Sequence, residues 1–439
     1  EVLYIKNVEI EEQVNEHGRM KIRFLSAGQL EETDTLRYRG TDMQLMTADG
    51  EVVFGGKCAS LRLMRENQYT EVEAVVTSAS IQTDQEARTE TYQGTGKTLG
   101  SVIAGGMGKS ALTQLDSDVA VSEMLSQENE TDWAFIRRIA NQYGKQLFVN
   151  SKTKGCQIHI GNVPFQKKEL GLVLHTGVSR DVDKVRGLQG NNSPDASVFE
   201  YEENVLTVSD LTLGVGYAVT YQNRTQIVTK SRITCIQGVL LNEITLANED
   251  GLKPSVAQSV GVTRRSSILT GTVIDVEGTN VKVDFGSSGD TPRWIPYAHA
   301  VSNYFYSMPD KGDTVFVYYE TGDSDKIVCL GSKHVNDSPD FARYQDKMLT
   351  ANNRMVKFGD KTTELIGDRK EFDGEGGEQA KIVFNDETGI EIQSTQDIRL
   401  ETTDGGNISI QAVKEDFAGM DALKETFQQM YGEGQEKYE

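Results

Sequence analysis

The chain of 439 residues is acidic, with 66 aspartates and glutamates against 45 lysines and arginines and a formal net charge of −21. That sign disfavours long-range attraction to nucleic acid and to anionic lipid, so no nucleic-acid binding is expected. The hydrophobic fraction of 37% is low, and 42 glycines against 7 prolines favour short strands joined by turns. We therefore expect about three structural units of mainly β structure.

The sequence shows no pattern typical of a signal peptide, a membrane span or paired cysteines. The sequence begins without a basic region followed by a cleavage site, and no stretch approaches the roughly 20 apolar residues that span a membrane. We expect synthesis in the cytoplasm without a signal peptide, and export by another component. The cysteines lie in strand-like stretches without a CxxC pair and are predicted to be buried, reduced thiols. They are Cys58, Cys156, Cys235 and Cys329.

The first ninety residues predict antiparallel hairpins. Met20, Ile22 and Phe24 alternate with charged residues after a turn at 15–18, and such alternation is typical of strands with one buried face. Strand patterns return from Leu170 onward. We therefore predict two barrel-like units in residues 1–265.

Between these units the hydrophobic period becomes helical. Apolar residues recur at helical spacing after Thr131, either Thr131 or Asn129 is the candidate N-cap, and Gly144 follows as a stop signal. Strand-like stretches at 146–149 and 157–160 come next. We expect an α/β insertion at about 95–165, with the helix packed through Trp133, Ile136, Ala140 and Tyr143.

The next segment, residues 266–335, reads as several short strands with turns at 277–278 and 310–312. Five short strands in about seventy residues predict an OB-fold barrel. The barrel alone says little about function, because barrels of this kind bind nucleic acids, sugars or proteins.

The strongest pattern is a short repeat near the end of the chain. Pairs of apolar residues separated by one polar residue begin 8, 8 and 10 residues apart. A short strand with one apolar stripe cannot bury that stripe alone and must stack on copies or on other chains. The predicted core of a trimeric needle is Ile382, Phe384, Ile390, Ile392, Ile398, Leu400, Ile408 and Ile410.

Several segments together resemble one protein family. They are Glu130 to Ala140, Gly271 to Val273, Val281 to Phe285, Trp294 to Pro296, Met308 to Asp313 and Val328 to Ser332. In this order, followed by the repeat, they resemble the VgrG-like spikes and tail hubs of contractile phage tails and type VI secretion systems. The resemblance covers about residues 1–412.

The resemblance implies a mainly β fold and a homotrimer. Six barrel-like units from three chains would match a hexameric inner tube, and an intertwined triple-stranded β-helix would form the needle. The domains implied are 1–265 (hub), 266–335 (OB-fold barrel), 336–380 (linker and needle start), 381–412 (needle) and 413–439 (amphipathic helical tail).

The resemblance also implies partners and a setting. Partners would be the inner tube protein, baseplate wedge proteins and a tip protein or effector, with transient contact with the target membrane. Assembly would take place in the baseplate of a phage-tail-like particle, with delivery on contraction. Phage tail, bacteriocin-like particle and type VI-like system remain open as the parent machine.

Sequence segments that resemble nucleotide-binding or metal-binding motifs do not have the residue spacing that those motifs require. Segments 94–98 and 105–110 look like parts of a P-loop, but the first glycine of that motif is Thr91 or Ile103 here. Histidines lack HxH and HxxxH spacing, so no metal ligands are predicted. Adjacent acids such as Glu202 and Glu203 leave a cell-wall hydrolase open as an alternative, beside a receptor-binding tail fibre. We predict no catalytic residues and no cofactor.

Overall fold

The computed structural model divides into two compact units, residues 1–333 and 334–439. Each unit is described by itself. The structure describes residues 2–27, 37–66, 69–94, 96–107, 111–115, 118–121, 124–153, 155–161, 166–191, 197–199, 201–236, 238–252, 266–286, 291–298, 307–320, 323–333, 347–351, 354–369, 378–402 and 408–409.

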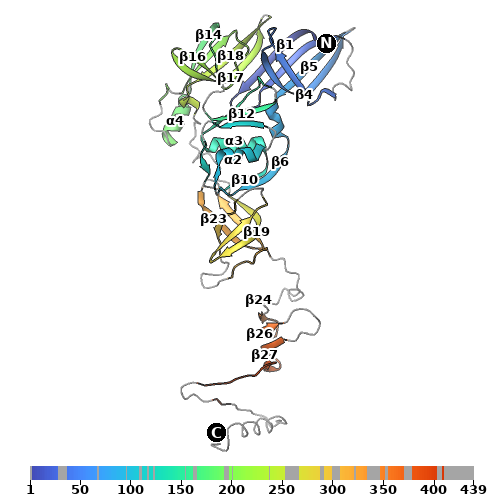
Figure 1. Ribbon diagram of the computed structural model, residues 1–439, viewed down its shortest axis with the longest axis vertical. Helices are drawn as coiled ribbons and strands as arrows, with labels where there is room; N and C mark the ends of the chain where they lie inside the picture. The colour runs from blue at the N-terminus through green and yellow to red at the C-terminus, as the bar shows by residue number, and fades with distance from the viewer. Residues whose placement is uncertain are drawn as a thin grey trace, which may run out of the picture. The chain divides into compact units, whose positions relative to one another are not determined.

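Eleven of the described strands form one sheet, which we call the hub sheet (Figure 1). Alternating residues such as Met20 and Ile22 are buried on its inner face because successive side chains on a strand point to opposite sides. The strands of its first half are β1 (Val2–Gln13), β2 (Arg19–Ala27), β3 (Asp42–Met46), β4 (Val52–Glu66) and β5 (Tyr69–Ser78).

The second half of the hub sheet joins the first through antiparallel pairing of β1 with β17, in which Ile10 faces Ile233. The two predicted barrel-like units thus share one hydrogen-bonded sheet, although each half has its own hydrophobic cluster. The second half contains β13 (Gln166–Lys167), β14 (Val173–Arg180), β15 (Glu202–Val208), β16 (Tyr217–Tyr221), β17 (Arg224–Ile236) and β18 (Val239–Ala247). Helix α4 (Val182–Asn191) follows β14, and η2 (Asp250–Leu252) follows β18.

Residues 87–161, between the two halves of the hub sheet, fold as an α/β module with its own hydrophobic cluster. The short helix η1 (Ala79–Asp84) precedes the module. The helices are α2 (Leu99–Met107) and α3 (Asp132–Gln142). The strands are β6 (Ala87–Tyr92), β7 (Lys97–Thr98), β8 (Ala111–Leu115), β9 (Ala120–Val121), β10 (Leu125–Thr131), β11 (Gln146–Val149) and β12 (Cys156–Gly161).

The last element of the first unit is a five-stranded antiparallel barrel. Its sheet order is β21-β20-β19-β22-β23, and a parallel bridge between Tyr297 and Cys329 joins the two ends. The strands are β19 (Ser266–Glu277), β20 (Asn280–Asp284), β21 (Trp294–Pro296), β22 (Thr314–Glu320) and β23 (Asp323–Ser332). Closure leaves Val281, Val283 and Val315 fully buried. The assignment to the OB class stays a prediction.

The second unit contains an antiparallel meander of five strands, which we call the spike sheet. They are β24 (Lys347–Ala351), β25 (Arg354–Phe358), β26 (Thr362–Arg369), β27 (Glu378–Asn385) and β28 (Gly389–Ser394). The fold class predicted from the sequence, mainly β, is confirmed. The predicted helical tail, 413–439, lies outside the described residues.

The prediction of four buried thiols is correct for Cys58, Cys156 and Cys329 but wrong for Cys235, which is exposed. Ile233 is buried in the hub core, yet β17 continues past that core, so Cys235 emerges into solvent. Burial raises the pKa of Cys156 to about 11 and also raises the pKa of Cys58. The buried thiols are therefore protonated at neutral pH.

No helix in the described part of the chain is both long enough and apolar enough to cross a membrane.

Candidate functional site

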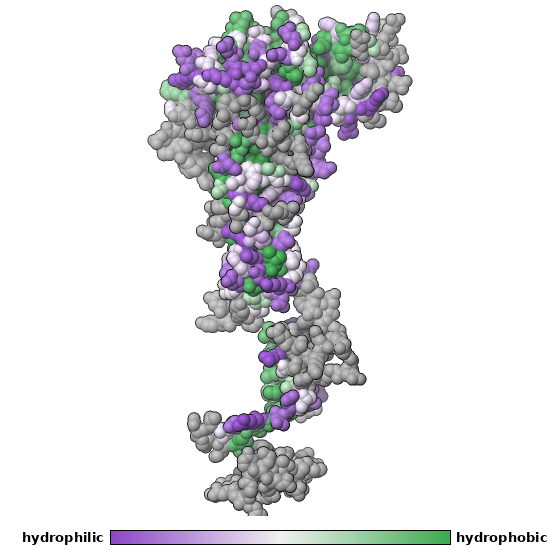
Figure 2. Space-filling view, viewed as in Figure 1, coloured by the Kyte–Doolittle hydropathy of each residue, from purple (hydrophilic) through white to green (hydrophobic). Residues whose placement is uncertain are grey.

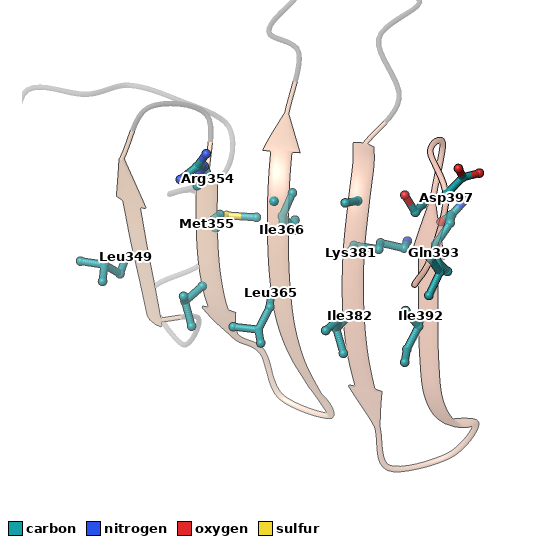
Figure 3. A pocket seen from close by; sticks show the side chains of 15 residues that line it. Leu349, Arg354, Met355, Leu365, Ile366, Lys381, Ile382, Ile392, Gln393 and Asp397 are labelled. Atoms are coloured by element: carbon teal, nitrogen blue, oxygen red, sulfur yellow. The ribbon is translucent and has the colours of Figure 1, made fainter. Parts of the chain in front are cut away.

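The spike sheet carries an apolar row across all five strands. Leu349 pairs with Val356, Val356 with Leu365, Leu365 with Ile382, and Ile382 with Ile392. Because paired residues in a sheet point to the same side, these five side chains share one face. Figure 3 shows Leu365, Ile382 and Ile392 at one level on neighbouring strands.

A second row lies two residues further along the same face. Phe358 pairs with Thr363, Thr363 with Phe384, and Phe384 with Ile390. Together the two rows form what we call the apolar face. Its members are Leu349, Val356, Phe358, Leu365, Ile382, Phe384, Ile390 and Ile392.

Most of the apolar face is open in the single chain. Ile390 is 69% exposed, Ile392 58% and Phe358 53%. Figure 2 shows the hydrophobic surface along this sheet. Burial of such half-exposed side chains stabilises an assembly by on the order of 1 kcal/mol each. A surface of this kind in a protein normally marks an interaction site.

The opposite face of the spike sheet has a different chemistry. The row between the two apolar rows points the other way and contains Lys357, Glu364 and Glu391, together with Met348 and Val383. Three of its five side chains are charged, but Val383 is buried, and so are Met355 and Ile366 in the next row on the same side. This side is therefore chemically mixed and partly covered within the chain, whereas the apolar face is exposed.

The apolar face is also hollowed. A groove of about 630 Å³ is lined by side chains from all five strands, and by Asp397 and Ile398 after β28 (Figure 3). The side chain of Ile398 therefore extends the lining beyond the last strand. Such a groove accepts apolar side chains of another sheet more readily than a flat surface does.

The structure places the predicted needle residues unevenly. Ile382 pairs with Ile392 and Phe384 with Ile390, so these four share the apolar face. The others do not join them in a strand. Ile398, Leu400 and Ile408 are each more than half exposed and lie outside the strands, and Ile410 lies outside the described residues.

Sequence reasoning missed the first three strands of this surface. Val356 and Phe358 flank Lys357, which is the same apolar-polar-apolar pattern as in the later pairs. Leu365 stands alone between Thr363 and Gly367, and Leu349 has only the small Ala351 two positions away. The pattern was therefore present but weaker in this part of the chain.

The predicted packing helix is α3, and Thr131 is its N-cap, whose hydroxyl accepts a hydrogen bond from the Ala134 amide at 3.2 Å. This bond satisfies one of the free amides of the first turn. Trp133, Ile136 and Ala140 are buried in the cluster of the α/β module, and Tyr143 packs against it.

Trp133 also contacts His17, in the connection between β1 and β2, with 4.1 Å between ring centroids. The His17 Nδ1 lies 2.7 Å from the Ser80 hydroxyl. Burial lowers the pKa of His17, although the Asp84 carboxylate opposes that shift. The ring is thus held as a neutral packing group between the hub sheet and α3.

The region around α2 does not fit a phosphate site. Gly100 lies in the first turn of α2, and its amide donates to the Asp118 carboxylate at 2.8 Å. This hydrogen bond lowers the pKa of Asp118. A phosphate at a helix N-terminus needs these amides free, and here a carboxylate already occupies one.

Hydrolase chemistry finds little support at the acids singled out from the sequence. Glu202 and Glu203 are neighbours on β15, so their side chains point to opposite faces of the strand. Arg180 donates to Glu202 at 2.8 Å. In the residues that the structure describes, no cluster of three or more histidines, cysteines or acids could hold a metal ion.

No known protein family and no curated protein matches the sequence. Solved structures do match. One is the E. coli c3393 protein, described as a type VI secretion component similar to the bacteriophage T4 tail proteins gp27 and gp5. It matches with a TM-score of 0.55 and 14% identity, over 75% of this chain and 97% of its own.

Two further matches come from structures of a PdpA–VgrG complex. The lidded Francisella form gives a TM-score of 0.51 at 10% identity, over 89% of this chain and 76% of the other. The lidless form gives 0.50 at 10% identity, over 89% and 93%.

The chain has the VgrG-like hub-and-spike fold. The resemblance inferred from the ordered sequence segments is thereby confirmed at the level of the fold. At 10–14% identity the likeness concerns architecture, so the roles of single residues rest on the geometry described above.

Proposed function

We propose that this chain is the structural hub and puncturing spike of a contractile injection machine, and that it acts as a homotrimer without catalysis. The hub would adapt a threefold spike to a sixfold inner tube. The spike would lead when the machine contracts. The hub-and-spike fold supports this role. The exposed apolar face of the spike sheet is the observation that supports a homotrimer.

The apolar face favours further copies of this chain as its partner. The face is a regular two-row strip, so the same strip on another copy is complementary to it in length and spacing. In the proposed trimer, three copies around an axis turn their apolar strips toward each other and leave the charged side chains of Lys357, Glu364 and Glu391 in water. Such closed cyclic symmetry leaves no strip uncovered and prevents open-ended growth.

The other partners follow by likeness. We propose the inner tube protein above the hub, baseplate wedge proteins at its side and a tip protein or effector at the spike, with transient contact with the target membrane. Two matching structures are of complexes between VgrG and a second protein, PdpA. This supports the proposal that the chain also carries a partner protein.

The test is the solution mass of the purified full chain by light scattering, with negative-stain imaging of the same fraction. A mass near three times 48.5 kDa, with a knob and a needle in the images, is expected. A compact monomer at micromolar concentration would refute the homotrimer and with it the spike.

A further inference from the structure

The α/β module touches both of its neighbours in the first unit, and its contact with the barrel runs through a buried glutamine. Gln93 is 2% exposed. Its Nε2 donates to the Val283 carbonyl at 2.9 Å, and its Oε1 accepts from the Arg293 amide at 3.0 Å. One amide side chain thus holds two separate segments of the barrel.

A second contact with the barrel uses a carboxylate. Glu128, on β10, accepts hydrogen bonds from the Tyr319 hydroxyl at 2.5 Å and from the Ser267 hydroxyl at 2.8 Å. Burial raises the pKa of Glu128, but these hydrogen bonds outweigh that effect, and the net shift is downward. The joint is therefore charge-assisted at neutral pH.

Apolar packing accompanies these polar contacts. Met124, just before β10, is 4% exposed and belongs to the hydrophobic cluster of the barrel. We call Gln93, Met124 and Glu128 the barrel joint. The joint combines a shared core with directional bonds, and directional bonds fix orientation where apolar contact alone permits sliding.

The module is held equally firmly on the hub side. The Asn15 amide donates to the Leu147 carbonyl at 2.9 Å, and the Leu147 amide donates to the Asn15 Oδ1 at 2.8 Å. In the turn after β11, Lys152 forms an ion pair with Glu12 at 3.1 Å. The two side chains of this pair are only 7% and 4% exposed.

We infer that the α/β module is a rigid coupler that sets the orientation of the barrel relative to the hub sheet, with Gln93 and Glu128 as its positioning residues. The functional reason for such a coupler rests on the proposed function, because a spike driven by a contracting sheath must not tilt against its hub. The covalent connection alone would not prevent such tilting.

The experiment measures the distance between the hub sheet and the barrel in the full chain. Spin labels are attached at Thr225→Cys on β17 and Thr272→Cys on β19, both exposed positions, in a Cys235→Ser background. Labelled chain is assembled with an excess of unlabelled chain, so that most assemblies carry one labelled pair. The unmodified joint should give one narrow distance distribution by pulsed electron paramagnetic resonance.

Gln93→Ala combined with Glu128→Ala should abolish the narrow distribution and replace it with a broad one. Each single variant, and Tyr319→Phe, should broaden it less. Gln85→Ala and Glu86→Ala, at exposed positions close in sequence to the module, serve as matched controls and should leave it unchanged. An unchanged narrow distribution in the double variant would overturn the inference.

Thermal melting separates orientation from stability. If the double variant melted earlier but kept the narrow distribution well below its melting temperature, the joint would stabilise without positioning, and the inference would be wrong. The mass of the same samples is measured by light scattering. A monomer with a joint-dependent distance would refute the proposed function alone, whereas a trimer with a joint-independent distance would refute the coupler alone.

Discussion

The barrel and the spike sheet are both five-stranded antiparallel sheets, yet they bury their apolar residues in different ways. In the barrel the end strands meet through Tyr297 and Cys329, and Val281 and Val315 are fully buried within one chain. The spike sheet stays open, and Ile390 on its apolar face is 69% exposed.

The two sheets differ in how the hydrophobic core on their apolar side is completed. A sheet that curls onto itself completes its core within the chain, so its stability does not depend on concentration. In the proposed homotrimer the open spike sheet completes its core with other copies, so its stability should follow protomer concentration. Substitutions in the two regions should therefore fail in different ways.

The largest effect is expected from Ile382→Asp combined with Ile392→Asp. These residues pair across β27 and β28 in the middle of the apolar face. In the assembled spike each carboxylate would be buried without a partner, which costs several kcal/mol per group. The mass in light scattering should fall from three chains to one, while the barrel and the hub sheet stay folded.

The matched control for this pair is Glu391→Asp, which lies between the two rows and points to the opposite side of the sheet. It should keep the trimer. Loss of the trimer in the control, or its survival in the double variant, would mean that the apolar face is not the contact between copies.

A smaller effect is expected in the barrel from Gly271→Ala. A methyl group there would overlap with the Val283 side chain and lie 2.8 Å from the Asp284 carbonyl oxygen. Such overpacking typically costs about 1–3 kcal/mol. Denaturant unfolding followed at two protein concentrations should show the same loss at both.

Gly177→Ala provides the control for that substitution, because the nearest atom to its added methyl would be 3.8 Å away. It should change the free energy of unfolding little. If Gly271→Ala acted only at low protein concentration, the barrel would depend on assembly as the spike sheet does.

A change of pH should alter the stability of the first unit, which contains His17. Burial lowers the pKa of His17 in the folded chain below its value in the unfolded chain. At pH values between these two, the unfolded chain binds more protons than the folded chain. Stability is therefore lost as the pH falls below the unfolded value of about 6.5. Unfolding of the first unit should become easier from pH 7 to pH 5, and His17→Asn should flatten this dependence.

Much of the fold could be predicted from local pattern. The alternation at Met20 and Ile22, the cap at Thr131 and the stop at Gly144 each act over a few residues, and the structure contains the corresponding strand and helix. The pairs at Ile382 and Ile392 likewise revealed the later part of the apolar face, because a two-residue period reports directly on one side of a strand.

The features that could not be predicted from the sequence depend on contacts between residues far apart in the chain. Gln93 and Val283 are 190 positions apart, and a lone polar residue has no period that reveals its partner. The exposure of Cys235 was missed for a related reason. Local hydrophobicity indicates a strand, but it does not tell how far that strand extends past the core.

The smallest predicted effect is on the cap of α3. Thr131→Ala removes the acceptor for the Ala134 amide and the hydroxyl that donates to Asp84, and loss of such a cap costs about 1 kcal/mol. Thr131→Ser keeps a hydroxyl in place and should restore most of the stability. Because the apolar side of α3 packs within the first unit, neither variant should change the mass of the assembly. Equal stability of the Ala and Ser variants would show that the hydroxyl contributes nothing, and a concentration-dependent loss would place α3 among the elements that need other copies.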